Sequence, residues 1–307
     1  MRGYGVEPGA DTHLVVTYRP FDKQRHQAIA MPNQQPTNWC RLRERRGNTK
    51  IHGITVFAGS TLLFHSLNYG PELQGWVLMK TIGILGGMSA ASTQIYYATL
   101  CRLTREQLGG LHSPDLLIRS LDFAGIEALQ KDGNWEAAGA LLNREARALE
   151  AGGAELLLLA TNTMHMLADS MMEGLSIPLL HIVDATADRL RTQGCRKPAL
   201  MATRFTMDGS FYRGRLEQFG LQPVMPDAQA RDVIHGIIYS ELCQNLINPA
   251  SRDSYLEICA DLQRAGADAL ILGCTEIGLL LNDGNVDMPV FDTTQIHCEE
   301  ALRLALA

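Results

Sequence analysis

Residues 156–165 read LLLLATNTMH and residues 269–278 read ALILGCTEIG, and these two segments resemble one another. Each is an apolar run that ends abruptly in small hydroxyl and amide residues, as a buried parallel strand does at the carboxyl edge of an α/β sheet. A second pair of similar segments follows, PLLHIVDAT at 178–186 and PVFDTT at 289–294. The repeat predicts two similar half-molecules that face one cleft. The two runs differ at one position that matters for chemistry, because Cys274 ends the second and Ala160 ends the first.

Strand-like and helical segments alternate almost without interruption from Met79 onwards. The clearest helical pattern is Trp135–Ala151, where Ala and Leu recur at helical spacing before two glycines stop it. The alternation predicts an α/β fold of parallel sheets with helices on both faces. The repeat suggests α/β domains at 79–190 and 191–290, with a last helix in 291–307 that packs back on the first domain. Strands are expected at 81–86, 116–121, 155–160, 179–183, 199–203, 269–273 and 290–292.

Residues 1–78 differ in composition from the rest of the chain. They contain 9 Lys and Arg against 5 Asp and Glu, whereas the remaining 229 residues contain 18 against 28. Their apolar stretch, 54–64, is too short to span a bilayer and begins too late for a signal peptide. We therefore expect 1–78 to be an extension outside any domain, either disordered or translated from a start upstream of Met79.

Composition narrows the classes of partner and compartment. With 307 residues, 46% of them hydrophobic, the chain can bury a full core. Its net charge of −6 argues against nucleic acid as a partner, and no segment suggests a membrane partner. Its seven cysteines show no paired spacing and no CxxC, which is typical of a reducing cytosol rather than of a disulfide framework or zinc site. We expect a cytoplasmic protein.

Cys274 is the strongest candidate for chemistry. Most cysteines in apolar runs are inert core residues, but this one ends its run and is expected at a helix N-terminus, where the dipole favours the thiolate. A free thiol with a pKa near 8.5 is only a few per cent ionised at neutral pH, so such help matters for a general base.

Polar residues after the other strand ends are weaker candidates. The segment GILGGMS at 83–89 suits either a tight strand-to-helix turn or a carboxylate-binding loop, and it lacks the GxGxxG and Walker patterns. Thr163 or Thr275 alone would be read as a helix N-cap, but the matched clusters TNT and TE favour a small-ligand site. Arg204 could bind a carboxylate or form a surface salt bridge. His165, His181 and His297 lack metal-ligand spacing and are expected to be capping or core residues.

These motifs resemble the aspartate/glutamate racemase family, whose members need no cofactor. The resemblance covers 79–307 and has no counterpart in 1–78. It implies two α/β domains in pseudo-twofold relation, an active site between them, a homodimer and a small acidic amino acid as substrate. Its motifs are GILGGMS at 83–89, LGGLHS at 108–113, TNTMH at 161–165, HIVDAT at 181–186, ATRFTM at 202–207, FYRGRL at 211–216 and GCTEIGLL at 273–280.

The resemblance also implies a mechanism and a set of site residues. The family uses two cysteines on opposite faces of the substrate Cα, a thiolate that abstracts the proton and a thiol that returns one. Cys274 matches the second cysteine, whereas Ala160 stands at the position of the first. The positions that carry over as substrate-binding are Met88, Ser89, Gln130, Thr161, Asn162, Thr163, Arg204, Thr275 and Glu276.

Ala160 leaves several functions open. Racemisation by two bases should be impaired, either by deliberate substitution or in a natural paralogue, unless another group supplies the proton. A relative with a single cysteine, such as a decarboxylase of the same superfamily, is an alternative. A binding protein with two α/β lobes is a third, against which the missing signal peptide and the Cys274 cluster count. Rapid, ligand-shielded labelling of Cys274 would favour an enzyme over a binding protein.

Overall fold

The computed structural model describes residues 39–43, 50–57, 61–68, 79–244 and 246–307, with side chains from residue 79 onwards. The chain divides into two compact units, Met1–Trp76 and Val77–Ala307. In the first unit, three strands pair antiparallel in the order β1-β2-β3. The expected extension at 1–78 lies largely outside the described residues. The strands are β1 (Trp39–Arg43), β2 (Lys50–Phe57) and β3 (Thr61–Asn68).

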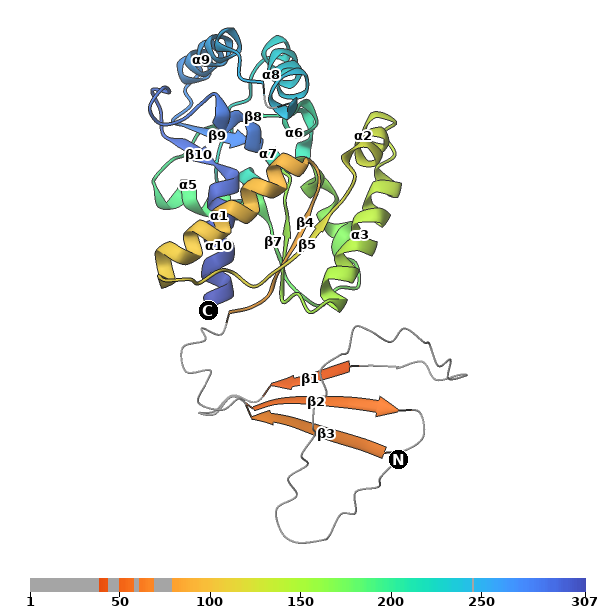
Figure 1. Cartoon of the computed structure of the whole chain (residues 1–307). Helices are drawn as coiled ribbons and strands as arrows, with labels where there is room; N and C mark the ends of the chain where they lie inside the picture. Colours follow the sequence, from red (N-terminus) through yellow and green to blue (C-terminus); the bar gives the residue numbers. More distant parts are fainter. Residues whose placement is uncertain (1–38, 44–49, 58–60, 69–78, 245) are drawn as a thin grey trace. The chain divides into compact units, whose positions relative to one another are not determined.

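The first parallel sheet of the second unit has the strand order β5-β4-β6-β7, and its strands β4, β5 and β7 are labelled in Figure 1. Side chains of β6 alternate between its two faces, as the period of a strand requires. Leu157 and Leu159 pack with α3, whereas Leu156 and Leu158 pack with α1 and α10. The strands are β4 (Ile82–Gly86), β5 (Leu116–Ser120), β6 (Leu156–Leu159) and β7 (Leu179–Leu180). The helices are α1 (Ala90–Leu108), α2 (Phe123–Lys131), α3 (Trp135–Ala151), α4 (Ala168–Met172) and α10 (Thr293–Leu306), with the short η2 (Thr163–Leu167).

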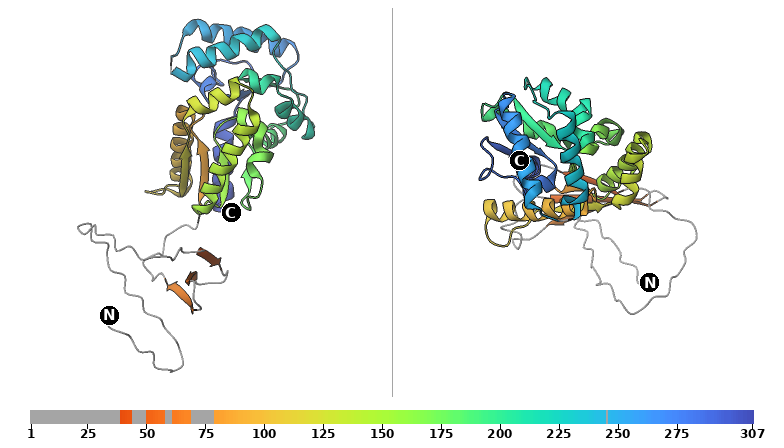
Figure 2. Two further views of the ribbon diagram at one scale, coloured as in Figure 1. Left: turned by 90° about the vertical axis from the view of Figure 1, so that its right-hand side faces the viewer. Right: turned by 90° about the horizontal axis from the view of Figure 1, so that it is seen from above.

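The second parallel sheet has the order β10-β9-β8, and Val224 forms a parallel bridge to Ala199 of β8. The second sheet repeats the strand order of the first. The bridge at Val224 takes the place of β5, and β8, β9 and β10 correspond to β4, β6 and β7. Helices α8 and α9 lie side by side at one end of this unit (Figures 1 and 2). The strands are β8 (Pro198–Ala202), β9 (Ala269–Gly273) and β10 (Val290–Asp292). The helices are α5 (Ile182–Thr192), α6 (Arg204–Asp208), α7 (Ser210–Gln218), α8 (Ala228–Ser240) and α9 (Pro249–Arg264), with the short η3 (Leu242–Gln244) and η4 (Thr275–Leu279).

Helix caps repeat between the two halves as well. Asp122 caps α2 and Asp227 caps α8, each accepting a hydrogen bond from a backbone N–H of the first turn. Asn134 caps α3 and Asn248 caps α9 in the same way. By order and by capping chemistry, α8 and α9 therefore correspond to α2 and α3.

The α/β fold class expected from the sequence is confirmed, and the helix expected at Trp135–Ala151 is α3. For the strand expected at 179–183, the predicted end was wrong. It stops at Leu180, because the side chain of His181 accepts a hydrogen bond from Val183 N and starts α5 at Ile182. In the turn after β4, Gly87 has φ of 86°, and a Cβ there would lie 2.1 Å from the carbonyl oxygen of Leu121. This glycine is needed for a tight turn.

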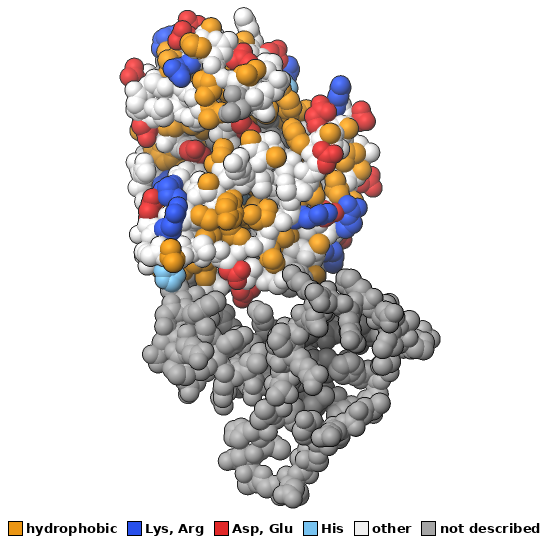
Figure 3. All heavy atoms as spheres, in the orientation of Figure 1, with side chains coloured by type: hydrophobic (Ala, Val, Ile, Leu, Met, Phe, Trp, Pro, Cys, Tyr) orange, Lys and Arg blue, Asp and Glu red, His pale blue; other side chains and the backbone are white. Residues whose placement is uncertain are grey.

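The described surface mixes apolar and charged side chains, as the face in Figure 3 shows. Tyr97 of α1 and Ile118 of β5 are exposed to 52% and 40%. Such exposure is ordinary on folded proteins and assigns no function. In the described part of the chain, no helix combines the length and the apolar character that crossing a bilayer requires.

Candidate active site

A pocket lies where the carboxyl ends of the two parallel sheets meet, as expected for an α/β fold. The segments that follow β4, β6, β8 and β9 supply its polar lining, and α2, α8 and η3 supply its other walls. The structure brings together the residues expected at the site, apart from Ala160 and Arg204: Met88, Ser89, Gln130, Thr161, Asn162, Thr163, Cys274, Thr275 and Glu276.

The carboxylate of Glu276 is the centre of a hydrogen-bond network that joins the two halves. Its Oε1 accepts from Ser89 Oγ at 2.9 Å and from Ser92 Oγ at 3.2 Å, both at the N-terminus of α1. Its Oε2 accepts from the Sγ of Cys274 at 3.0 Å. Ser92 Oγ also lies 2.6 Å from Thr275 Oγ1. Three donors therefore hold a buried carboxylate against the candidate thiol.

The thiolate expected at Cys274 is not favoured by this environment. Burial raises the pKa of Cys274 well above its ordinary value, and the charge and hydrogen bond of Glu276 raise it further. The helix that follows, η4, is a five-residue 3₁₀ helix, which has only a small dipole. Cys274 is therefore held as a thiol that donates to Glu276, a state suited to a general acid.

Two buried amide oxygens in the pocket have no hydrogen-bond partner in the described structure, Asn162 Oδ1 and Gln130 Oε1. The orientation of Asn162 follows from its neighbours. Thr293 Oγ1 donates to Leu272 O at 2.8 Å, so it must accept from Asn162 Nδ2, which lies 3.0 Å away. This leaves Asn162 Oδ1 as a free acceptor. Gln130 Nε2 similarly donates to the Sδ of Met164, at 3.0 Å.

Three threonine hydroxyl groups meet beside the pocket, and two of these residues, Thr163 and Thr203, line it. Thr163 Oγ1 lies 2.9 Å from Thr203 Oγ1 and 3.0 Å from Thr206 Oγ1, and all three side chains are buried. Thr163 follows β6 and Thr203 follows β8, so this cluster also joins the two halves. Each hydroxyl can donate or accept, so the cluster can adapt to the polarity of a ligand.

Ala160 directly follows β6, but it is not the counterpart of Cys274. Leu158 pairs with Leu180 and Ile271 pairs with Phe291, and Leu180 and Phe291 each precede the residue that caps the next helix. Counted from these pairs, Thr161 corresponds to Cys274 and Ala160 to Gly273. The side chain of Ala160 is fully buried, in the core cluster that contains Leu158 and Tyr96, and it does not line the pocket. Thr161 lines the pocket at the place of a second thiol, and its hydroxyl group is far less acidic than a thiol.

Arg204 does not lie where the sequence-based expectation placed it. Its Nε donates to Asp208 at 2.9 Å, its Nη1 pairs with Asp232, and nearly half of its side chain is exposed. It lines a separate hollow with Phe205 and His235. The surface salt bridge considered above is the arrangement that the structure shows, because Asp208 lies one helical turn further along α6.

Sequence reasoning missed one wall of the pocket, formed by Ile238, Tyr239 and Cys243 of α8 and η3. Burial raises the pKa of the Cys243 thiol to about 12, and the charge of Glu276 adds to this effect. Ser92, Phe123, Thr203 and Gly273 were also missed. A sequence signal for this wall exists. Asp122 and Asp227 are equivalent helix caps, and their repeat could have shown that α8 corresponds to α2, which also forms a wall of the pocket.

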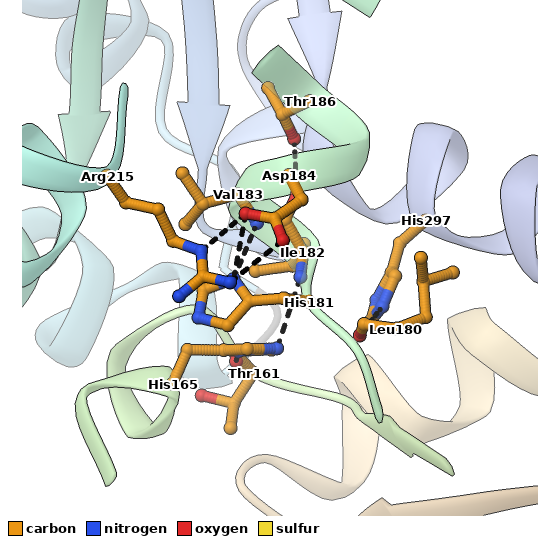
Figure 4. Close-up of polar contacts among 10 residues, drawn as sticks. All are labelled: Thr161, His165, Leu180, His181, Ile182, Val183, Asp184, Thr186, Arg215 and His297. Carbon is orange, nitrogen blue, oxygen red and sulfur yellow. Dashed lines mark hydrogen bonds and ion pairs between the residues drawn. The ribbon is translucent and has the colours of Figure 1, made fainter. Parts of the chain in front are cut away.

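Three neutral histidines are packed behind the strand-end loop of Thr161 (Figure 4). His165 Nδ1 lies 2.7 Å from Thr161 O, and its Nε2 accepts from Ile182 N, so this ring ties the loop to α5. His297 Nε2 donates to Leu180 O at 2.9 Å, and its Nδ1 lies 2.8 Å from the hydroxyl of Tyr96. Desolvation lowers the pKa of His165 well below its ordinary value and the pKa of His297 to about 4. The interpretation of these histidines as capping or core residues is confirmed.

Desolvation, followed by the charge of Arg215, also lowers the pKa of His181 to about 4. Arg215 is paired with Asp184. Among the described residues, no group of three His, Cys, Asp or Glu side chains is arranged to hold a metal ion.

Comparisons with known proteins agree with this architecture. An Asp/Glu racemase candidate from Yersinia pestis is 45% identical, with a TM-score of 0.71 over 75% of this chain and 100% of the other. An aspartate racemase homologue from Pyrococcus horikoshii OT3 is 34% identical, with a TM-score of 0.67 over 75% and 100% of the two chains. RacX of Bacillus subtilis (strain 168), a broad specificity amino-acid racemase, is 22% identical over 238 residues, which are 74% of this chain and 98% of RacX.

A family model described as Asp/Glu/Hydantoin racemase matches residues 85–301. The matched residues include the lining of the pocket, from Met88 to Glu276. The chain therefore belongs to the Asp/Glu/hydantoin racemase family.

Proposed function

We propose that this protein transfers protons at the Cα of an amino acid, with Cys274 as its acid and base and with racemisation impaired because Thr161 stands in the place of a second thiol. The hydrogen bond of 3.0 Å between Cys274 Sγ and Glu276 Oε2, inside a pocket at the junction of the sheets, carries the proposal. The racemase relatives support the reaction class.

Glu276 can accept the proton of the Cys274 thiol. When the thiol proton moves to Glu276 Oε2, a thiolate and a neutral carboxylic acid result, and no net charge is added to the pocket. The thiolate then takes the proton of Cα and leaves a carbanion on the substrate. Return of a proton from the same thiol regenerates the starting enantiomer. Ser89 and Ser92 hold the carboxylate in position through Oε1.

The free acceptors suit the substrate ammonium group. Asn162 Oδ1 and Gln130 Oε1 are buried and unpaired among the described residues, and an ammonium group offers three donors. Leaving a buried acceptor unpaired typically costs about 1–3 kcal/mol, so a ligand that pairs with both relieves this cost. The hydroxyl groups of Thr161 and Thr163 can donate to the α-carboxylate.

Racemisation also requires a proton on the opposite face of Cα, where Thr161 offers a hydroxyl group that is far less acidic than a thiol. We therefore expect exchange of the Cα hydrogen of one enantiomer, with very slow inversion. Loss of a positioned acid or base typically costs about 10²–10⁴-fold in rate.

The decisive experiment is incubation of the protein in D₂O with a panel of L- and D-amino acids, followed by mass spectrometry of deuterium at Cα. Exchange should occur in one enantiomeric series and be abolished in Cys274→Ala. Cys101→Ala is the matched control, because this thiol lies on α1 and outside the pocket lining. Absence of exchange with every amino acid, or undiminished exchange in Cys274→Ala, would refute the proposal.

Thr161, in the place of a second thiol, favours a second candidate, a decarboxylase that protonates a carbanion from one face only. Such a reaction needs the Cys274 thiol but no second thiol, and the high pKa of Cys274 keeps the thiol protonated. Release of CO₂ from a substituted malonate, without Cα exchange in any amino acid, would identify this activity. A protein that binds amino acids and catalyses neither reaction would be the non-enzymatic alternative.

A further inference from the structure

The charge of the pocket lining is informative about the substrate side chain. Among the described residues that line the pocket, Glu276 is the one acidic side chain, and none is Lys, Arg or His. Glu276 is 4% exposed. The α-ammonium and α-carboxylate groups of an amino acid cancel one another, so the site with a bound amino acid already has an excess negative charge.

The cation that the sequence resemblance assigned to the site is engaged elsewhere. Arg204 pairs with Asp208 and Asp232 in its own hollow. A chain of ring contacts runs from that hollow to the pocket, with centroid distances of 5.8 Å from Trp135 to Phe205, 5.9 Å from Phe205 to His235 and 4.6 Å from His235 to Tyr239. Desolvation and the charge of Arg204 lower the pKa of His235, so this series of rings contributes no cation at neutral pH.

The remaining wall of the pocket is apolar or uncharged. Met88 and Ile238 are buried, and Phe123 and Tyr239 are partly exposed. An uncharged side chain can pack on this wall and gain from the burial of apolar surface. A carboxylate there would lose its hydration without gaining a counter-charge, which is strongly unfavourable.

We infer that the pocket selects amino acids with an uncharged side chain and discriminates against aspartate and glutamate. The inference rests on the proposed function, because it names the substrate class of the same site. It differs from the acidic amino acid that the sequence resemblance implies.

Pairs of amino acids of nearly the same shape isolate the effect of the side-chain charge on binding. Glutamine and glutamate, and asparagine and aspartate, differ little in shape, so calorimetric titration of each enantiomer into the full-length protein measures the effect of the carboxylate. The amide of each pair should bind at least about tenfold more tightly, a factor that corresponds to 1.4 kcal/mol. Equal or tighter binding of glutamate and aspartate would overturn the inference.

Variants locate the origin of the selectivity. Ile238→Lys places a cation in the wall and should shift the preference towards glutamate, whereas the neutral Ile238→Met should not. Arg204→Gln should leave the ratio of the glutamine and glutamate affinities unchanged. This variant does not alter the buried wall, so it tests the inference even if Ile238→Lys does not fold. A fall in glutamate affinity in Arg204→Gln would place Arg204 in the site and overturn the inference.

Binding and exchange separate the two proposals. Preferential binding of glutamine without Cα exchange would support the selectivity and refute the proposed function. Exchange of glutamate as fast as that of glutamine, with equal affinities, would support the function and refute the selectivity. If neither member of any pair binds, both are refuted.

Discussion

Thr161 is the residue where the chain departs most clearly from the catalytic pattern of its repeat. Thr161→Cys replaces a hydroxyl group with a thiol in the pocket lining, at the place in the repeat that Cys274 holds, and should make inversion at Cα measurable by chiral chromatography. The expected gain is about 10²-fold or more, because a positioned acid or base is restored. Ala160→Cys enlarges a fully buried side chain outside the pocket lining and should instead lower the free energy of unfolding, by about 1–3 kcal/mol.

Thr161→Ser is the control for this change, since it keeps a hydroxyl group, which is far less acidic than a thiol. It should gain no inversion. Failure of Thr161→Cys to invert any amino acid that shows Cα exchange would mean that the first catalytic position lies elsewhere.

Glu276 is the second residue with a separable effect. Glu276→Gln keeps the size of the side chain but removes the charge that raises the pKa of Cys274. The midpoint of the pH profile for alkylation of Cys274 by iodoacetamide should therefore move to lower pH, while Cα exchange falls because the proton acceptor is lost. Mass spectrometry of the modified peptides distinguishes Cys274 from Cys243. An unchanged or higher midpoint would show that Glu276 does not control this thiol.

Among the elements, α10 links the two halves of the second unit, because it follows β10 and packs on α1 and α5. Asp292 caps it, with Oδ1 accepting from Thr294 N at 2.8 Å and from Gln295 N at 3.2 Å. Asp292→Ala should lower the free energy of urea unfolding by about 0.5–2 kcal/mol, whereas Asp292→Asn should stay near the parent value. Equal stability of the two variants would show that the cap contributes nothing.

At the scale of the whole molecule, the buried histidines make stability depend on pH. The pKa of His181 and of His297 is about 4 in the folded protein and near 6.5 when unfolded, and the pKa of His165 is also lowered. As pH falls below 6.5, the unfolded state binds protons that the folded state does not, so the free energy of unfolding falls. The loss should reach about 1 kcal/mol per histidine by pH 5.5.

Urea unfolding between pH 7 and pH 5.5 measures this loss, because the ordinary carboxylates remain ionised there. His297→Gln should make the pH dependence shallower by the share of one histidine. A stability that does not change across this interval would contradict the assignment of these rings as neutral and buried.

The sequence by itself determined the class of fold and the centre of the site. Alternating strand and helix periods predict parallel sheets, and the polar residues that end LLLLATNTMH and ALILGCTEIG predict a site at their carboxyl edges. The missing second thiol is visible in the same segments, whereas the strand registers were needed to place it at Thr161 rather than at Ala160. These features are local, so neighbours in the chain are enough to reveal them.

Tertiary structure decided the polarity and chemistry of the pocket. Asn162 owes its orientation to Thr293, which is 131 positions away, and Glu276 meets Ser89 across 187 positions. Arg204 is removed from the site by Asp232, and the thiol state of Cys274 follows from burial beside Glu276. Charge, desolvation and hydrogen-bond direction depend on all atoms within a few ångströms, most of which come from distant segments, and no local pattern in the sequence records them.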